Sequence, residues 1–190
     1  MKVGKVTCLL VATTVLGLLP LACEAGGVGD PCIPEDEYFD TFNGYQKEEV
    51  TAESRSFQCE TRVCLVHHFQ GRVSCPYGQT EDEAKNDPQC MIPGTSQPVV
   101  VPVDPQITAR RDIDAVYCSC RCRNIDGKTD DGARYCECPS GYDCERVYEN
   151  VGLGKEQLTG YYCIKQGTKY DPSRIGTPCT RVSQNCEPAE

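Results

Sequence analysis

The chain opens with an apolar stretch that follows a short basic segment. Lys2 and Lys5 precede the apolar residues 6–22, and this order is typical of a secretory signal peptide. The stretch contains Pro20 and is shorter than the about 20 apolar residues that a bilayer span needs. We therefore expect residues 1–22 to be a cleaved signal peptide, with an uncleaved membrane anchor as the alternative.

Further along the chain, short apolar and polar stretches alternate. Residues 62–69 predict a strand, residues 70–71 a tight turn and residues 72–76 a returning strand. Another strand is predicted over residues 161–165. The pattern therefore favours short β-strands that are joined by turns.

Helical patterns are few and short. The charged segment 81–86 predicts a single helical turn. Residues 145–157 predict a partial helix that Gly152 and Gly154 interrupt. The expected fold is therefore small and mostly made of short β-strands and loops, with little helix.

The composition indicates that cysteines supply much of the stability. Leu, Ile, Val and Phe account for only about 16% of residues 23–190, a proportion typical of chains that cannot bury enough apolar surface to fold. Each disulfide typically adds about 2–4 kcal/mol of stability, and disulfides persist in oxidising compartments. We therefore expect an exported, disulfide-rich protein. The cysteines expected to pair are Cys32, Cys59, Cys64, Cys75, Cys90, Cys118, Cys120, Cys122, Cys136, Cys138, Cys144, Cys163, Cys179 and Cys186.

A proline-rich segment separates these cysteines into two regions. Residues 31–92 hold five of them and residues 112–190 hold nine. Residues 93–111 contain four prolines and predict an extended linker, although its valines could also lie along a sheet edge. Because both counts are odd, complete pairing within one chain requires at least one disulfide between the two regions.

The densest cysteine pattern is a repeat of Cys-x-Cys on both sides of a predicted turn. Alternate residues of a strand share a face, and the Asp-Gly pairs at residues 126–127 and 131–132 favour turns. The pattern predicts a hairpin with one sulfur-lined face. The cysteines on this face would be Cys118, Cys120, Cys122, Cys136 and Cys138.

Two kinds of chemistry are open to these sulfur atoms. Cysteines two apart rarely bond each other, so disulfides would run to Cys144, to Cys163 or to the first region. As thiolates, the Cys-x-Cys repeats could instead bind zinc or copper. Exported chains usually oxidise their cysteines, so disulfides are the favoured interpretation.

The segment Cys136-x-Cys138-x-x-Gly141-Tyr142 resembles the end of an EGF-like module. The resemblance covers fewer than ten residues. Only one residue separates Tyr142 from Cys144, whereas the family usually has several. The segment is therefore EGF-like in style, and the chain is not a clear member of that family.

Acidic residues crowd the predicted turn of the hairpin. Asp126, Asp130 and Asp131 offer oxygen ligands that suit calcium. Their spacing does not match an EF-hand loop, and a solvated acidic turn without a metal is the alternative. We expect no cofactor.

The sequence contains no pattern of an enzyme that we could identify. His67 and His68 are its two histidines, and on a strand they would point to opposite faces. Cys64 lies nearby, but a disulfide-bonded cysteine cannot act as a nucleophile. We therefore expect solvated or packed histidines and no catalytic site.

The net charge and one acidic–aromatic segment indicate which classes of partner the protein could bind. The net charge is −9 for the whole chain and argues against nucleic acid as a partner. Glu35, Asp36 and Glu37 lie beside Tyr38 and Phe39, and this acidic–aromatic segment could contact a protein or glycan partner. The alternative is a local cluster that packs with Phe42 and Tyr45.

The end of the signal peptide, Leu19-Pro20-Leu21-Ala22-Cys23, resembles the lipobox of bacterial lipoproteins. Ala22 and Cys23 match that motif. Together with the glycine-rich residues 23–30 and the Cys-x-Cys repeats, this end resembles the cysteine-rich lipoproteins of Gram-negative bacteria. The resemblance implies a lipid on Cys23 and a place at the outer membrane, because Glu24 rather than Asp follows the cysteine.

Three functions follow from these features as hypotheses. The favoured one is a non-enzymatic, lipid-anchored cell-envelope protein with a binding or structural role, tethered through residues 23–30. The second is a soluble secreted effector or inhibitor, produced by cleavage after Ala25. The third is a metal-binding protein that uses Cys-x-Cys thiolates.

Overall fold

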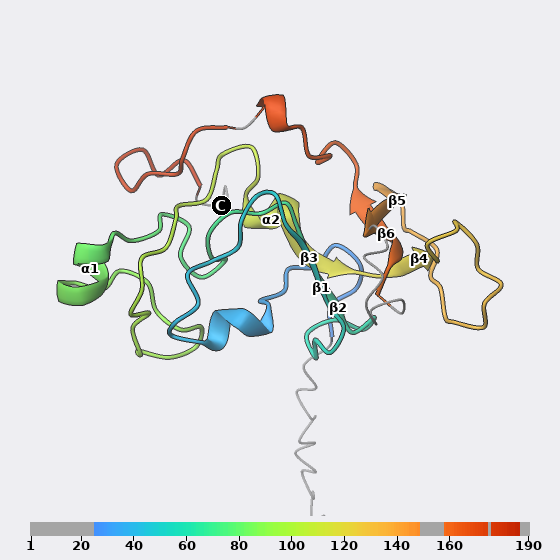
Figure 1. Ribbon diagram of the computed structural model, residues 1–190, viewed down its shortest axis with the longest axis horizontal. Coiled ribbons are helices and arrows are strands. Elements are labelled where there is room, and N and C mark those ends of the chain that lie inside the picture. Colours follow the sequence, from blue (N-terminus) through green and yellow to red (C-terminus); the bar gives the residue numbers. More distant parts are fainter. Residues whose placement is uncertain (1–24, 149–157, 175, 187–190) are drawn as a thin grey trace, which may run out of the picture.

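The computed structural model of the chain describes residues 25–148, 158–174 and 176–186. The predicted signal peptide and the lipidation candidate Cys23 lie outside these residues. Within them, the chain forms two small antiparallel sheets that are connected by long loops (Figure 1). The predicted fold class, a small disulfide-rich protein with short strands and little helix, is confirmed.

The first sheet contains β1 (Val50–Glu53), β2 (Val63–His67) and β3 (Val116–Ser119), in that order. The predicted strand over residues 62–69 corresponds to β2. The predicted hairpin with residues 72–76 is wrong, because β2 pairs with β1 and β3 instead. The backbone turns away after β2, where His68 and Gly71 have positive φ angles of 52° and 84°.

The second sheet has the order β4-β6-β5, with β4 spanning Arg121–Arg123, β5 Tyr142–Tyr148 and β6 Gly160–Lys165. The predicted strand over residues 161–165 is confirmed by β6. The partial helix predicted over residues 145–157 is wrong at residues 145–148, which belong to β5. Residues 149–157 lie outside the described part of the chain.

The predicted sulfur-lined hairpin is also wrong. The chain bends at Cys120, so that β3 and β4 belong to different sheets. Cys136 and Cys138 lie in a loop rather than on a returning strand, and the partner of β4 is β6. The three alternating cysteines before the turn are nevertheless all buried.

Helical segments are short. They are η1 (Glu35–Tyr38), α1 (Glu81–Asn86), α2 (Asp112–Ala115) and η2 (Pro172–Arg174). The α1 helix has the bounds predicted from the sequence. A capping box defines its start, since the Thr80 side chain accepts a hydrogen bond from the Glu83 N–H and the Glu83 carboxylate accepts one from Thr80 N–H.

Each of the fourteen cysteines from Cys32 to Cys186 is bonded to another. The Cys59–Cys118 bond joins the first cysteine-rich region to the second, and the other six lie within one region or the other. The pairs are Cys32–Cys64, Cys59–Cys118, Cys75–Cys90, Cys120–Cys136, Cys122–Cys144, Cys138–Cys163 and Cys179–Cys186.

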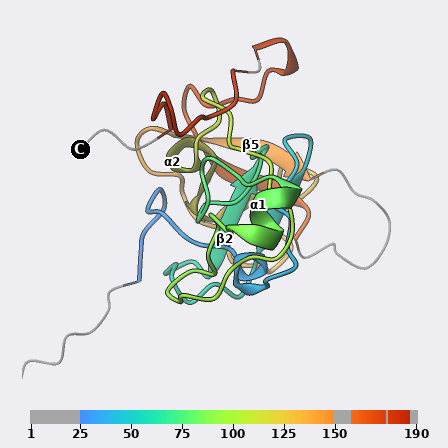
Figure 2. The same ribbon diagram turned by 90° about the vertical axis from the view of Figure 1, so that its left-hand side faces the viewer.

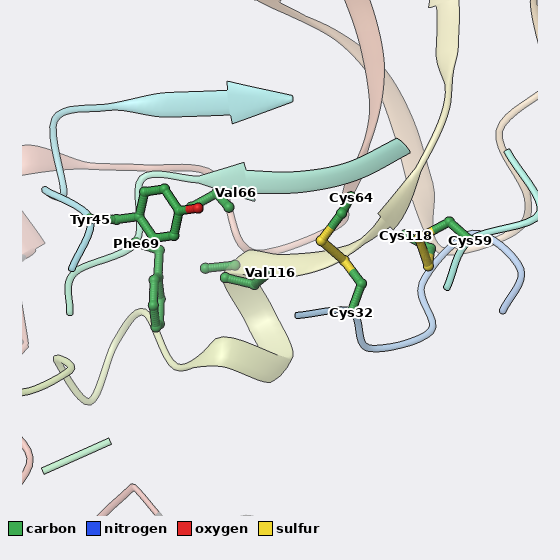
Figure 3. Packing of buried hydrophobic residues seen from close by; sticks show 9 residues of the cluster. Cys32, Tyr45, Cys59, Cys64, Val66, Phe69, Val116 and Cys118 are labelled. Atoms are coloured by element: carbon green, nitrogen blue, oxygen red, sulfur yellow. A yellow bond between two sulfur atoms is a disulfide. The ribbon is translucent and has the colours of Figure 1, made fainter. Parts of the chain in front are cut away.

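The buried apolar residues form small clusters around these disulfides. In one cluster, Tyr45, Val66, Phe69 and Val116 pack beside the Cys32–Cys64 and Cys59–Cys118 bonds (Figure 3). A second cluster joins the two sheets, where Leu65 and Tyr117 contact the buried residues Tyr162 and Ile164. Sulfur therefore occupies interior positions that aliphatic side chains fill in most proteins.

The proline-rich segment 93–111 is part of the body. Val99 and Val103 are buried against the Cys75–Cys90 disulfide. The buried amide of Gln79 fixes this segment, since its Nε2 donates to the carbonyl oxygens of Val99 and Val101. The valines therefore pack into the core and form only the isolated bridge between Gln79 and Val103, rather than lying along the edge of either sheet.

Both ends of the described chain pack onto the same body. Gly26 donates its N–H to the Gln58 carbonyl oxygen and accepts from the Glu60 N–H, so the glycine-rich residues 26–30 are docked. At the other end, the segment after β6 returns across the molecule, and Cys179 N–H donates to the Gln106 carbonyl oxygen. Figures 1 and 2 show this segment, in red, along one side of the body.

Candidate functional site

The acidic–aromatic segment predicted as a contact surface divides into an inward and an outward part. Glu37 has no exposed surface, whereas Tyr38 and Phe39 are 47% and 56% exposed. The short 3-10 helix η1 produces this division, because successive residues point to different sides of it. The outward part forms one wall of a cleft.

The inward part is an ion pair between Glu37 and Arg72, and both side chains are fully buried. The carboxylate accepts hydrogen bonds from the N–H groups of Val73 and Ser74 and from the Ser74 hydroxyl. Burial raises the pKa of Glu37, and these donors and Arg72 oppose the rise. The pair anchors η1 to the loop after β2.

Arg72 reaches across this loop with its remaining N–H groups. Its guanidinium donates to the carbonyl oxygens of Glu37, Phe39 and Phe42. Three backbone carbonyls of the segment 37–42 are therefore held by one side chain. This arrangement fixes the positions of the exposed Tyr38 and Phe39 beside it.

The cleft next to η1 has a volume of about 420 Å³. Its lining comes from η1 and from the loop after β1, and consists of Ile33, Glu35, Tyr38, Glu53, Arg55, Ser56, Phe57 and Gln58. Phe57 is 79% exposed, and the Arg62 guanidinium lies 4.1 Å from the centre of its ring. Exposed aromatic rings beside a concave surface are typical of binding sites.

Hydrogen bonds and disulfides hold the two walls of this cleft together. The Gln58 side chain accepts from the Ile33 N–H at 3.0 Å and donates to the Ile33 carbonyl oxygen at 2.7 Å. Ile33 follows Cys32, and Gln58 precedes Cys59, so each wall is also adjacent to a disulfide. The cleft is therefore rigid before any ligand binds.

The cleft is lined by the carboxylates of Glu35 and Glu53 and by the guanidinium of Arg55. Glu53 accepts a hydrogen bond from the Glu35 N–H at 3.0 Å. Burial raises the pKa of Glu53, and the negative charges of Glu35 and Asp36 raise it further. A cationic group of a ligand would relieve this repulsion, and the rings of Tyr38 and Phe57 would pack against the ligand's apolar part.

The two histidines lie close together, contrary to the expectation that they point to opposite faces. Their ring centres are 4.7 Å apart, because His68 leaves the strand with a positive φ angle. His67 is buried beside Arg110. Burial lowers the pKa of His67, and the positive charge of Arg110 lowers it further, to about 3. His68 stacks on Tyr170 with ring centres 4.1 Å apart. Both imidazoles are therefore packed, which is one of the two states expected from the sequence.

Several cysteines lie close enough together to resemble a set of metal ligands, but all of them are bonded in disulfides. Among the described residues, the groups with ligand spacing consist of cysteines alone, and every one of these sulfur atoms belongs to a disulfide. A disulfide sulfur is no thiolate ligand. The residues that form these groups therefore do not fit zinc or copper in this state.

The calcium candidates do not form a common site. Asp131 accepts hydrogen bonds from the Tyr135 hydroxyl and the Asn124 amide. These bonds, led by that from Tyr135, lower the pKa of Asp131. Asp126 and Asp130 do not join Asp131 in any group with metal-ligand spacing in the described part of the chain.

Besides Ile33, five residues of the cleft were not recognised from the sequence: Glu53, Arg55, Ser56, Phe57 and Gln58. They come into contact with η1 only through the fold. One signal was present, because Phe57 is a single aromatic residue in the polar segment 54–58 directly before a cysteine.

Searches against protein-family models, curated proteins and solved structures found no match to this chain. Within the described residues, none of the helices has the length and apolar character needed to cross a bilayer. The seven disulfides are consistent with an extracellular or exported protein.

Proposed function

We propose that this chain is an exported, non-enzymatic binding protein that a lipid on Cys23 holds at the outer membrane or cell surface. The observation that supports it most is the bonding of all fourteen cysteines from Cys32 to Cys186 in disulfides. Such crosslinks form and persist outside a reducing cytosol. A disulfide-rich fold of this kind is compatible with a stabilised non-enzymatic protein.

The partner in this proposal is a protein, bound at the cleft between η1 and the loop after β1. The cleft combines the exposed rings of Tyr38 and Phe57 with the carboxylates of Glu35 and Glu53. A segment in which a lysine or arginine lies beside an apolar side chain would match both features. The rigid walls would lower the entropic cost of binding.

The test is the intact mass of the exported protein, measured before and after reduction and alkylation. We expect an N-terminal Cys23 with attached acyl chains and fourteen alkylated cysteines that become reactive only after reduction. A Cys23→Ser variant is the matched control, and it should lose the acyl mass while keeping all seven disulfides.

The other outcomes contradict the proposal in distinct ways. An unacylated chain that begins at Gly26 would identify a soluble secreted effector or inhibitor. Free thiols together with bound zinc or copper would identify a metal-binding protein that uses the Cys-x-Cys repeats.

A further inference from the structure

The loop between β1 and β2 borders a second cleft, which has a volume of about 700 Å³. Ser54, Glu60, Thr61 and Arg62 contribute to it from this loop. The rest of its lining comes from the second cysteine-rich region and from Val63, and consists of Val63, Cys120, Arg121, Ala133, Arg134, Tyr135, Cys136, Leu158 and Tyr162. Its size lies within the range of small-molecule binding sites, about 300–1,000 Å³.

Three arginines from separate segments meet at this cleft, which we call the arginine cleft. Arg62, Arg121 and Arg134 line it, whereas Glu60 is the one acidic residue among the described residues of the lining. Asp131 lies nearby, and the positive charge of Arg121 contributes to the lowered pKa of its carboxyl. The positive charges outnumber the negative ones here, although the whole chain has a net charge of −9.

Disulfides fix the backbone that presents these arginines. Arg121 lies between Cys120 and Cys122, which are bonded to Cys136 and Cys144. Arg134 is two residues before Cys136. Disulfides therefore restrain the backbone around the arginine cleft, and little backbone freedom is lost when a ligand binds.

Aromatic rings orient two of the guanidinium groups. Arg121 lies 5.3 Å from the centre of the Tyr135 ring, and Arg62 lies 4.1 Å from that of Phe57. Stacking on the Phe57 ring leaves the N–H edge of the exposed Arg62 guanidinium available for oxygen acceptors. The planar fork of these N–H groups matches two oxygens of one phosphate or sulfate.

Three arginines outside the arginine cleft are already engaged with other groups of the protein. Arg72 and Arg110 are buried and donate to backbone carbonyls, and Arg181 forms an ion pair with Glu83. Arg62 and Arg134 are exposed and form no ion pair with any described residue. Their charge is available to a ligand.

We propose that the arginine cleft binds a small polyanion that carries several phosphate or sulfate groups. The exposed guanidinium groups of Arg62 and Arg134 provide separate contacts for two such groups, and Arg121 adds a third positive charge to the lining. The volume of about 700 Å³ exceeds what one inorganic anion would fill. This site adjoins the protein-binding cleft beside η1, since Arg62 stacks on Phe57 of that cleft, and it does not depend on the lipid anchor.

The test is isothermal titration calorimetry of the oxidised protein at physiological ionic strength. The probes are inositol hexakisphosphate, a heparin-derived tetrasaccharide and inorganic phosphate. We expect binding of one molecule of at least one polyanion, and much weaker binding of inorganic phosphate. A preference between the first two probes would identify phosphate esters or sulfated sugars as the source of the anion.

Two pairs of substitutions separate this site from general charge attraction. The Arg62→Gln/Arg134→Gln variant should weaken binding about 100-fold, since each charge-assisted contact contributes about tenfold. The Arg146→Gln/Lys169→Gln variant removes the same charge from exposed residues outside the arginine cleft and should change the affinity less than about threefold, as expected for screened charges.

Three results would overturn the proposal. They are the absence of binding of either polyanion at millimolar concentration, equal weakening by both pairs of substitutions, and unchanged affinity in the Arg62→Gln/Arg134→Gln variant. Circular dichroism and the mass after alkylation would first verify that each variant retains its fold and its seven disulfides.

Discussion

Cys59 and Cys118 are bonded across the interior, with their Cα atoms 5.4 Å apart and 59 positions apart in the sequence. Both are fully buried beside the Cys32–Cys64 bond (Figure 3). Among the disulfides of the described chain, this one connects the two cysteine-rich regions. It also lies next to Gln58, so it supports the cleft beside η1.

The first prediction concerns the length of chain that this disulfide closes. A crosslink over about 60 residues restricts the unfolded chain by about 4 kcal/mol, whereas one over about 8 residues contributes about 2 kcal/mol. The Cys59→Ala/Cys118→Ala variant should therefore lose more stability than Cys179→Ala/Cys186→Ala, whose sequence separation is 7. Guanidinium unfolding measures both, and equal losses would contradict the argument.

The second prediction concerns the chain without its crosslinks. The buried clusters are small and built around sulfur, so they cannot offset the conformational entropy of about 150 ordered residues without disulfides. Full reduction should unfold the protein. Near- and far-ultraviolet circular dichroism in strong reductant measures this, and a retained native spectrum would show that the apolar clusters suffice.

The third prediction concerns the buried ion pair. Removing one partner leaves an uncompensated charge in the interior, and Glu37→Gln or Arg72→Met should each cost about 3–5 kcal/mol. The double variant should lose much less than the sum of the single losses. Denaturant unfolding of all four proteins forms the thermodynamic cycle, and additive losses would mean that the two residues act independently.

The fourth prediction concerns pH. The pKa of His67 is lowered from 6.5 to about 3 in the folded protein, so the unfolded chain binds a proton more readily between these values. The stabilisation that depends on neutral His67 should be complete above pH 6.5. Below this pH, the free energy of unfolding should fall by about 1.4 kcal/mol per pH unit.

Unfolding measured between pH 7 and pH 4 tests the role of His67. The His67→Gln variant carries no titrating group at this position, so its stability should decline less steeply over this range. An identical slope in the variant and the native protein would assign the pH dependence to other groups.

The fifth prediction concerns the cleft beside η1. A fluorescent peptide with arginine next to leucine should bind there, and Phe57→Ala should weaken binding about tenfold or more, as expected for an aromatic contact residue. Val182→Ala is the matched control, since Val182 is 99% exposed and lies outside the cleft. Fluorescence anisotropy measures the affinity, and equal effects of both substitutions would exclude this binding surface.

Elements with a local cause were predictable from the sequence. The α1 helix follows from the capping pair Thr80 and Glu83, and the strands β2 and β6 follow from their β-branched and aromatic residues. In each case, the residues that determine the structure lie within a few positions of one another.

The errors in prediction have distant causes. The hairpin expected after β2 fails because Arg72 turns inward to Glu37, which is 35 positions away. The strand expected through Cys120 fails because its two halves pair with different sheets. The parity of the cysteines required a disulfide between the regions, but only the fold identifies it as Cys59–Cys118.

The same limit applies to the cleft beside η1. Residues 35–39 were recognisable because their acidic and aromatic side chains are adjacent in the sequence. The opposite wall was not, since Gln58 reaches Ile33 across 25 positions. A binding surface made by two distant segments leaves no pattern in either segment alone.

The hydrogen bonds of Gly26 with Gln58 and Glu60 limit the distance between the folded body and a bilayer to which Cys23 would be attached. If Cys23 carries the proposed lipid, only residues 23–25 can span the gap, and three extended residues reach about 10 Å. The body would then lie close to the headgroups. Its distance from the membrane would therefore vary little.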